Sequence, residues 1–265
     1  LRTGNREGKT EQFPALPRDA THWVASVDAI ERMRAAVLSP PRRDESLSSD
    51  GPRWTRETEK TGGDAPRFDV VGIDAEWRPQ SGSPVALLQI ATRREAFLVD
   101  TLALCGDENQ KAAASLNRFL ADLFARRDVV KLGFGLEHDF SRLRRSFPES
   151  LACVAEPARV CRSAGFVDVR TLCALAFPEK KKLRKTGLAV TVASVLGAYV
   201  DKTEQCSDWA RRPLTQSQTA YAAADAHVLT ALFDRCAYRA ASEVAAALSD
   251  PEAPLAQPPD AREGG

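Results

Sequence analysis

Apolar and polar positions alternate along the chain in patterns that predict both strands and helices. Five short runs of β-branched and small apolar residues, bounded by turn-forming residues, predict central strands. Apolar residues at helical spacing predict amphipathic helices around them. The strands are expected at about 70–77, 85–91, 95–100, 129–134 and 165–169, and the helices at about 28–38, 109–124, 139–147, 172–176, 191–196 and 215–240.

The connections between these elements predict a mixed sheet. Two short loops join the first three strands, which predicts an antiparallel meander rather than strands separated by helices. Strand and helix then alternate from about residue 129 onwards, as in α/β proteins. A further short edge strand is expected at 22–25. The predicted fold is therefore α/β, with a five-stranded mixed sheet and helices on both faces.

Both ends of the chain and one internal segment lack apolar periodicity. Residues 1–21 and 246–265 are polar and proline-containing, which predicts disordered tails. Residues 39–67 are rich in Pro, Arg, Ser, Glu and Gly, which predicts a flexible insertion. The rest, 22–245, is expected to form one domain. Because the sequence begins with Leu1 rather than methionine, we expect it to be a segment of a longer chain.

Charge and cysteine content limit the kinds of partner, metal site and cellular compartment that the sequence favours. The formal net charge is +1, so a nucleic-acid partner has to be argued from local charge and not from the total. Six scattered cysteines without a CxxC pair, together with three histidines, argue against a zinc site. Scattered cysteines without a secretory signal favour an intracellular protein of the cytoplasm or nucleus. No apolar run reaches the roughly 18 residues that a membrane span needs.

Two acids end the first central strand. Asp74 and Glu76 are two residues apart, so their side chains point to the same face. Paired carboxylates on one face repel each other unless they share a cation or a proton, and their oxygen atoms suit Mg²⁺ or Mn²⁺. Taken alone, this stretch is equally compatible with a strand that runs out into the polar turn at 78–84.

A third acid, Asp139, follows the fourth strand at the start of a helix, where a site at one edge of an α/β sheet is expected. The alternative is an N-capping aspartate, which accounts for most aspartates at such a position. The preceding Gly133-Phe134-Gly135 lacks the spacing and the lysine of a phosphate loop. Its glycines are expected to let the backbone pass close to another element or to a ligand.

The last helix contains Tyr221 and Asp225 at positions i and i+4, so both side chains lie on one face. The alanines between them would let the helix approach the sheet closely. An ordinary core tyrosine and a solvated aspartate would have the same spacing.

Together, Asp74-x-Glu76, Asp139 and Tyr221-x-x-x-Asp225 resemble the three motifs of the DEDDy class of 3′-to-5′ exonucleases, which includes ribonuclease D and has a ribonuclease H-like fold. The segments 71–77 and 202–209 most resemble the animal mut-seven-type exonuclease domains. The resemblance covers about residues 22–240. It extends, in order, to Gly187-Leu188, Leu196-Gly197, Asp201-Lys202, Gln205-Cys206-Ser207-Asp208-Trp209, Arg212-Pro213-Leu214 and Tyr221-Ala222-Ala223.

The resemblance implies a metal-dependent hydrolase that removes nucleotides from the 3′ end of a single-stranded nucleic acid, with RNA favoured and small-RNA trimming as one role. Two ions, Mg²⁺ or Mn²⁺, are implied. Asp74 would bridge both ions, and Asp139 would hold one of them. Glu76 and Asp225 would hold the ion that activates water, and Tyr221 would orient that water.

Nucleic-acid contacts are expected from two kinds of residue. Trp77 and Phe134 could stack on or wedge against the terminal base, or could pack in the core. A basic run could follow the phosphate backbone, or could be a solvated charged segment. This run contains Lys180, Lys181, Lys182, Arg184 and Lys185.

Two alternatives to the RNA exonuclease remain at this level. One is a catalytically silent ribonuclease H-like module that binds nucleic acid or protein, and the other is an exonuclease that prefers DNA. RNA and DNA differ at the sugar 2′-hydroxyl, for which the sequence identifies no contact residue.

Overall fold

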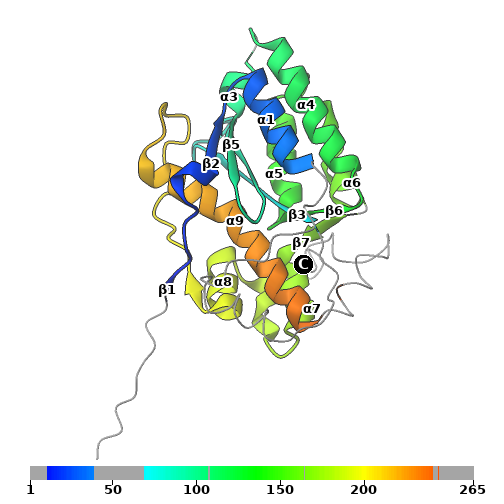
Figure 1. The fold of residues 1–265 in the computed structure, drawn as a ribbon, viewed down its shortest axis with the longest axis vertical. Coiled ribbons are helices and arrows are strands. Elements are labelled where there is room, and N and C mark those ends of the chain that lie inside the picture. Colours follow the sequence, from blue (N-terminus) through cyan, green and yellow to red (C-terminus); the bar gives the residue numbers. More distant parts are fainter. Residues whose placement is uncertain (1–10, 39–68, 107, 164, 241–243, 245–265) are drawn as a thin grey trace, which may run out of the picture.

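The central strand β3 (Asp69–Trp77) organises the structure, a computed structural model that describes residues 11–38, 69–106, 108–163, 165–240 and 244 (Figure 1). β3 pairs antiparallel with β4 along its second half and parallel with β6 along its first half. It therefore joins an antiparallel part of the sheet to a parallel part. The six-stranded sheet has the order β2-β5-β4-β3-β6-β7, in which β2 is Thr21–Val24, β4 Val85–Ala91, β5 Ala96–Asp100, β6 Val129–Gly133 and β7 Phe166–Asp168.

The predicted mixed sheet is confirmed, with one strand more than expected. β3, β4 and β5 form the antiparallel meander, and β6 and β7 continue the sheet in parallel. The edge strand expected at 22–25 is β2, which pairs in parallel with β5. The prediction of five strands is wrong because β2 joins the main sheet through a long-range pairing, which local sequence pattern does not specify.

The expectation of a disordered tail up to residue 21 is also wrong for residues 11–21. β1 (Glu11–Gln12) pairs with β8 (Ala198–Tyr199), and a short 3₁₀ turn, η1, occupies Arg18–Ala20. Between them, Phe13 is 3% exposed and lies 5.6 Å from the ring of His227. The buried ring of Phe13, together with the partly buried Leu16, thus anchors this segment on the core. The expected disorder of residues 1–10, 39–67 and 246–265 concerns parts of the chain outside the described residues.

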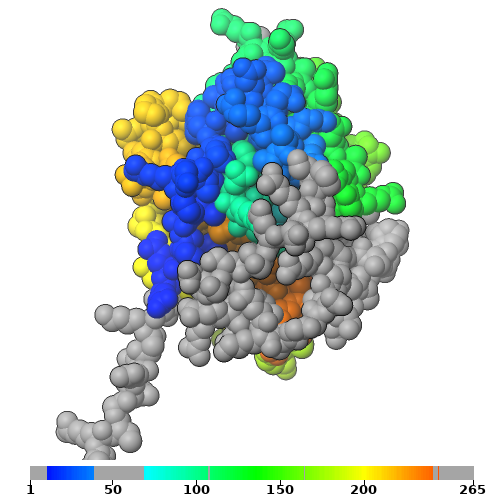
Figure 2. All heavy atoms as spheres, in the orientation of Figure 1, coloured from blue at the N-terminus to red at the C-terminus, as the bar shows by residue number. Residues whose placement is uncertain are grey.

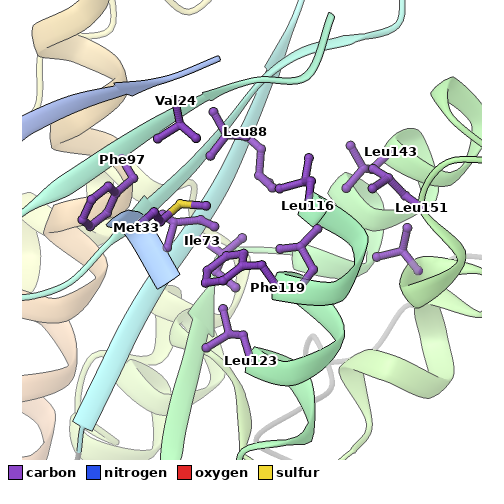
Figure 3. Close-up of a cluster of buried hydrophobic side chains, with 14 of the residues drawn as sticks. Val24, Met33, Ile73, Leu88, Phe97, Leu116, Phe119, Leu123, Leu143 and Leu151 are labelled. Carbon is purple, nitrogen blue, oxygen red and sulfur yellow. The ribbon is translucent and has the colours of Figure 1, made fainter. Parts of the chain in front are cut away.

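Helices cover both faces of the sheet (Figure 1). On one face, the odd-numbered residues of β3 pack against α1, α4 and α5, and Figure 3 shows Ile73 beside Met33 and Phe119 in this core. Residues 11–38 lie across the surface seen in Figure 2, in blue. The helices are α1 (Val27–Leu38), α3 (Thr101–Leu104), α4 (Gln110–Ala125), α5 (Leu136–Ser146), α6 (Pro157–Cys161), α7 (Val169–Ala176), α8 (Leu188–Leu196) and α9 (Gln216–Arg239).

The helix α9 lies directly on β3 on the opposite face. A Cβ atom on Gly72 would lie 2.1 Å from the carbonyl oxygen of Ala226, so only glycine permits this approach. Ala222 and Ala223 are also buried, where α9 packs on the neighbouring strands β4 and β5. Small residues on both elements therefore bring the backbone of α9 close to β3, as the sequence predicts.

None of the helices in the described part of the chain is both long enough and apolar enough to cross a membrane.

Replacing Gly72 with alanine is expected to lower the free energy of unfolding by about 1–3 kcal/mol, because the added methyl group overlaps the Ala226 carbonyl. Chemical denaturation measures the change. Gly187→Ala is the matched control, since nothing lies within 4 Å of a Cβ built there, and it should cost less than about 1 kcal/mol. Equal stability of both variants would show that α9 can move away from β3 without cost.

Candidate active site

Three carboxylates meet where β3 passes under α9. Asp74 and Glu76 come from β3, and Asp225 comes from α9. Each offers an oxygen atom, and these atoms all lie within 4.8 Å of one another. The period-two alternation of β3 puts both of its acids on the same face as Gly72, which is the face that α9 covers.

Asp139 approaches this cluster from the first turn of α5. Its side chain is buried, and Asp74 contributes to raising its pKa, which places the two carboxyls within electrostatic reach. The helix begins after Gly135, whose φ of +85° is left-handed, so Asp139 is not the N-cap residue. Gly133 packs so closely on Leu136 that a Cβ would lie 2.6 Å from it. The two glycines thus make the tight turn that aims the first turn of α5 at the site.

Tyr221 lies one turn before Asp225 on α9. Its hydroxyl oxygen accepts a hydrogen bond from Lys202 Nζ at 3.3 Å, and its ring packs on Trp209 with centroids 5.7 Å apart. Burial, followed by the negative charges of Asp225 and Glu76, raises the pKa of Tyr221 far above its usual range. The phenol therefore remains protonated at neutral pH and acts as a hydrogen-bonding group.

Crowding and burial change the protonation of the acids. Burial, and then the neighbouring Asp225, raises the pKa of Asp74 to about 7. Burial, and then Asp74, raises the pKa of Glu76 to about 10. The Asp139 pKa is raised well above its usual range, mainly by burial. Without a compensating cation, these groups would be partly protonated at neutral pH.

The donor set fits a divalent cation. Asp225 Oδ1 is buried and has no hydrogen-bond partner among the described residues, while Oδ2 accepts from Lys202 Nζ at 2.7 Å. A lone buried carboxylate oxygen beside two further carboxylates supplies the hard oxygen ligands that such ions prefer. Asp74, Glu76 and Asp225 could hold one ion directly.

Two residues near the acids received no role from sequence pattern alone. Lys202 contacts Asp225 and Tyr221, whereas the sequence places it only within the C-terminal signature of the resemblance. Gln89 lies directly opposite Asp74 in the β3–β4 pairing, fully buried, and its amide has no hydrogen-bond partner in the described structure. Gln89 is the one polar residue of β4, and this interruption of an apolar strand is the signal that could have identified it.

The residues proposed to contact nucleic acid have mixed surroundings. Trp77 is half-buried, with the guanidinium of Arg142 4.4 Å from its ring centre, and it follows Glu76 after a β-bulge. Phe134 is half-buried beside Arg170, at 4.5 Å. Both rings are partly in the core and partly accessible.

The basic run forms the 3₁₀ turn η3 (Lys181–Lys185), anchored by the buried Leu183. Lys180 donates to the backbone carbonyl of Ser194, so it connects the turn to α8. Within the described part of the chain, the hydrogen bonds and ion pairs of this turn do not reach the acidic cluster. The exposed cations of the turn are Lys181, Lys182, Arg184 and Lys185.

The mixed sheet flanked by helices defines an α/β protein of the ribonuclease H-like class. A family model described as 3′-5′ exonuclease matches residues 55–237, and the chain belongs to this family. Membership implies the use of a divalent metal ion, in agreement with the acidic cluster.

Similar proteins agree with this assignment. The human exonuclease mut-7 homolog is 36% identical over 226 residues, which are 82% of this chain and 22% of the relative. Ribonuclease D of Gluconacetobacter diazotrophicus is 32% identical over 161 residues, covering 60% of this chain and 35% of that protein. The predicted likeness to mut-seven-type domains is thus confirmed. The chain spans only about a quarter to a third of the length of these relatives.

A solved structure supports the fold. The EXO domain of Aedes aegypti Nibbler superimposes with a TM-score of 0.63 at 22% identity, covering 90% of this chain and all of that domain. The expected ribonuclease H-like fold is confirmed by this likeness.

Divalent-ion binding is expected to tighten as the pH rises from about 6 to about 8. The pKa of Asp74 is raised to about 7, so below this pH an incoming ion has to displace a proton. Because this pKa lies above the value of an unfolded aspartate, the stability of the metal-free fold falls as the pH rises from about 4 to about 7 and stays lowered above pH 7.

Titration calorimetry with Mg²⁺ in two buffers of different ionisation enthalpy measures both the affinity and the protons released. An affinity that is independent of pH, without proton release, would contradict the raised pKa of Asp74.

Proposed function

We propose that this domain is a 3′-to-5′ exonuclease that hydrolyses the terminal phosphodiester of a single-stranded nucleic acid, with RNA favoured. The carrying observation is the convergence of Asp74, Glu76 and Asp225 oxygens within 4.8 Å beside the Tyr221 hydroxyl. The family assignment and the similarity to the mut-7 homolog and to ribonuclease D support the reaction class.

The proposed cofactor is a pair of Mg²⁺ or Mn²⁺ ions. When bound, such a pair supplies water activation and neutralises charge on the attacking and leaving oxygens. Asp74 would contact both ions, and Glu76 with Asp225 would hold the one near the attacking water. Asp139, on a separate element, would hold the other. This division follows the family pattern and agrees with the three-acid cluster and the more distant Asp139.

Tyr221 has the properties of a water-orienting group. Its pKa is far too high for it to act as a base at neutral pH. Lys202 donates to the phenolic oxygen, and a hydrogen bond between the hydroxyl and Asp225 contributes to the raised pKa. The hydroxyl group therefore orients its neighbours by hydrogen bonding and does not remove a proton.

Substrate contacts are proposed on two surfaces. Trp77 lies directly after Glu76 in the chain, and Phe134 lies in the turn that precedes α5, so both rings belong to the segments that carry the acids. A terminal base could stack on the accessible face of either ring. Lys181, Lys182, Arg184 and Lys185 expose cations that a single strand could follow.

A catalytically silent binding module is less well supported, because all four acids and Tyr221 are present and three of the acids converge on one point. A preference for DNA differs from the proposal only in the sugar that is recognised.

Asp225→Asn is expected to lower the rate of hydrolysis by at least about 10³-fold, since it removes a charge from the cluster that would hold the ions. Tyr221→Phe is expected to lower the rate by about 10²-fold, because the ring remains and only the hydroxyl is lost. Single-turnover assays on a labelled RNA measure both, and circular dichroism checks the fold. Asp28→Asn, at an exposed position of α1, is the control and should retain full activity. Wild-type turnover by Asp225→Asn would refute the assignment of the site.

A 5′-labelled single-stranded RNA incubated with the protein should shorten progressively from its 3′ end in Mg²⁺ or Mn²⁺ and remain intact in EDTA. A DNA strand of the same sequence should shorten more slowly. Faster shortening of the DNA would refute the preference for RNA but not the exonuclease activity. Binding of both strands without shortening, in either metal, would instead support the silent module.

A further inference from the structure

Among the residues that the structure describes, Lys202 is a cation in contact with the acidic cluster. It lies in the segment between β8 and α9, and its Nζ donates to Asp225 Oδ2 at 2.7 Å and to the Tyr221 hydroxyl oxygen at 3.3 Å. Nζ also lies 5.1 Å from the centre of the Tyr221 ring.

The two partners of this ion pair differ in their access to solvent. The Asp225 side chain is 3% exposed, whereas that of Lys202 is 27% exposed. Asp225 belongs to the long helix α9 and is fixed by it, but Lys202 has a flexible four-carbon chain on an irregular segment. The ammonium can therefore leave the carboxylate and remain hydrated, while Asp225 has to stay in the site.

We propose that Lys202 exchanges partners: its ammonium balances Asp225 while no divalent ion is bound, and it binds a phosphate of the nucleic acid once the ions are in the site. This inference rests on the proposed function and adds to it a substrate-binding residue that also serves as the internal counter-ion of the empty site.

The first half of the exchange follows from like-charge repulsion. The cluster concentrates carboxylates within 4.8 Å, and Lys202 Nζ lies 2.7 Å from Oδ2 of Asp225, one of its members. A divalent ion bound to Asp225 would lie a few ångströms from the ammonium. The repulsion between the ion and the ammonium scales with the product of their charges, so binding of both to Asp225 is unfavourable. Lys202 thus competes with the ion for Asp225.

The second half follows from the charge balance of the loaded site. The four carboxylates carry the same total charge as two divalent ions, with opposite sign. The Lys202 ammonium therefore gives the ion-loaded site a net charge of +1. One phosphodiester carries the matching negative charge. Lys202 contacts Tyr221, the residue proposed to orient the attacking water, so its ammonium is within a side-chain length of the place where the scissile phosphate would lie.

Ion binding tests the competition without any nuclease assay. Calorimetric titration of the whole chain with Mn²⁺ should give at least about tenfold tighter binding to Lys202→Met than to the wild type. Lys202→Arg keeps the charge and should bind Mn²⁺ like the wild type. Lys185→Met, which removes an exposed cation from η3, should leave the affinity unchanged. Equal or weaker Mn²⁺ binding by Lys202→Met would overturn the competition.

If Lys202→Met does not fold, the competition between Lys202 and the ion can be tested on the wild-type protein. Lysines carrying ¹³C-methyl groups give separate NMR signals, and the signal lost in Lys202→Arg identifies Lys202. This signal should shift when Mg²⁺ is added to the metal-free protein, because the ammonium then loses its carboxylate partner. It should also change when diamagnetic Mg²⁺ at saturation is replaced by paramagnetic Mn²⁺, because the lysine lies near the ion. An unchanged signal on Mg²⁺ addition would show that the ammonium keeps its partner.

Strand binding tests the phosphate contact. In Ca²⁺, with strand length monitored on a gel, fluorescence anisotropy compares a normal RNA with one whose 3′-terminal linkage is an uncharged methylphosphonate. Lys202→Met should weaken binding of the normal strand by about fivefold to tenfold and leave binding of the neutral strand unchanged. Equal weakening of both strands would overturn the contact with this phosphate.

These experiments separate the two proposals. If the wild-type protein shortens no strand, the proposed function fails, while the ion titration still decides whether Lys202 competes for Asp225. If the wild type is active but Lys202→Met binds ions and strands normally, only the exchange of partners fails.

Discussion

The burial of several carboxylates at one point is the constraint on which the rest of the structure depends. Asp74, Glu76 and Asp225 bring oxygens within 4.8 Å of one another, and burial raises the pKa of the two strand acids to about 7 and about 10. Such a cluster is unfavourable unless a cation compensates it. The fold therefore has to hold the acids against their own repulsion, which requires rigid elements and close packing.

That rigidity comes from the contact between β3 and α9. Gly72 lies against the backbone of Ala226, and α9 begins with a capping box in which Thr215 and Gln218 satisfy each other's backbone amides. The helix is thereby fixed both along its length and at its start. Tyr221 and Asp225 lie about 1.7 and 2.8 turns after the Thr215 cap, so their positions over the sheet are set by the helix itself.

The segment that carries Lys202 is held by side chains from several elements. Arg78, just beyond β3, forms a bidentate ion pair with Asp208, and Gln218 donates to Ser207 and to the Asp208 carbonyl. Arg212 forms a second bidentate pair with Asp100 at the end of β5. These contacts link the segment to the sheet and to α9, which explains how residues distant in sequence act at one site.

The sequence by itself determined the elements and most of the acids. Period-two spacing put Asp74 and Glu76 on one face, and helical spacing put Tyr221 and Asp225 on another, because these relations depend only on local backbone geometry. The sequence could not reveal that β2 pairs with β5, that Phe13 anchors residues 11–20 on the core, or that Asp139 is not a helix cap.

Only the tertiary structure decided which residues complete the site. Lys202 reaches Asp225 from 23 positions away, and Gln89 lies opposite Asp74 through strand pairing. Such contacts depend on the packing of whole elements, so no local pattern predicts them. The charge of the acids was likewise decided by burial, since identical carboxyls in an unfolded chain would be ionised at neutral pH.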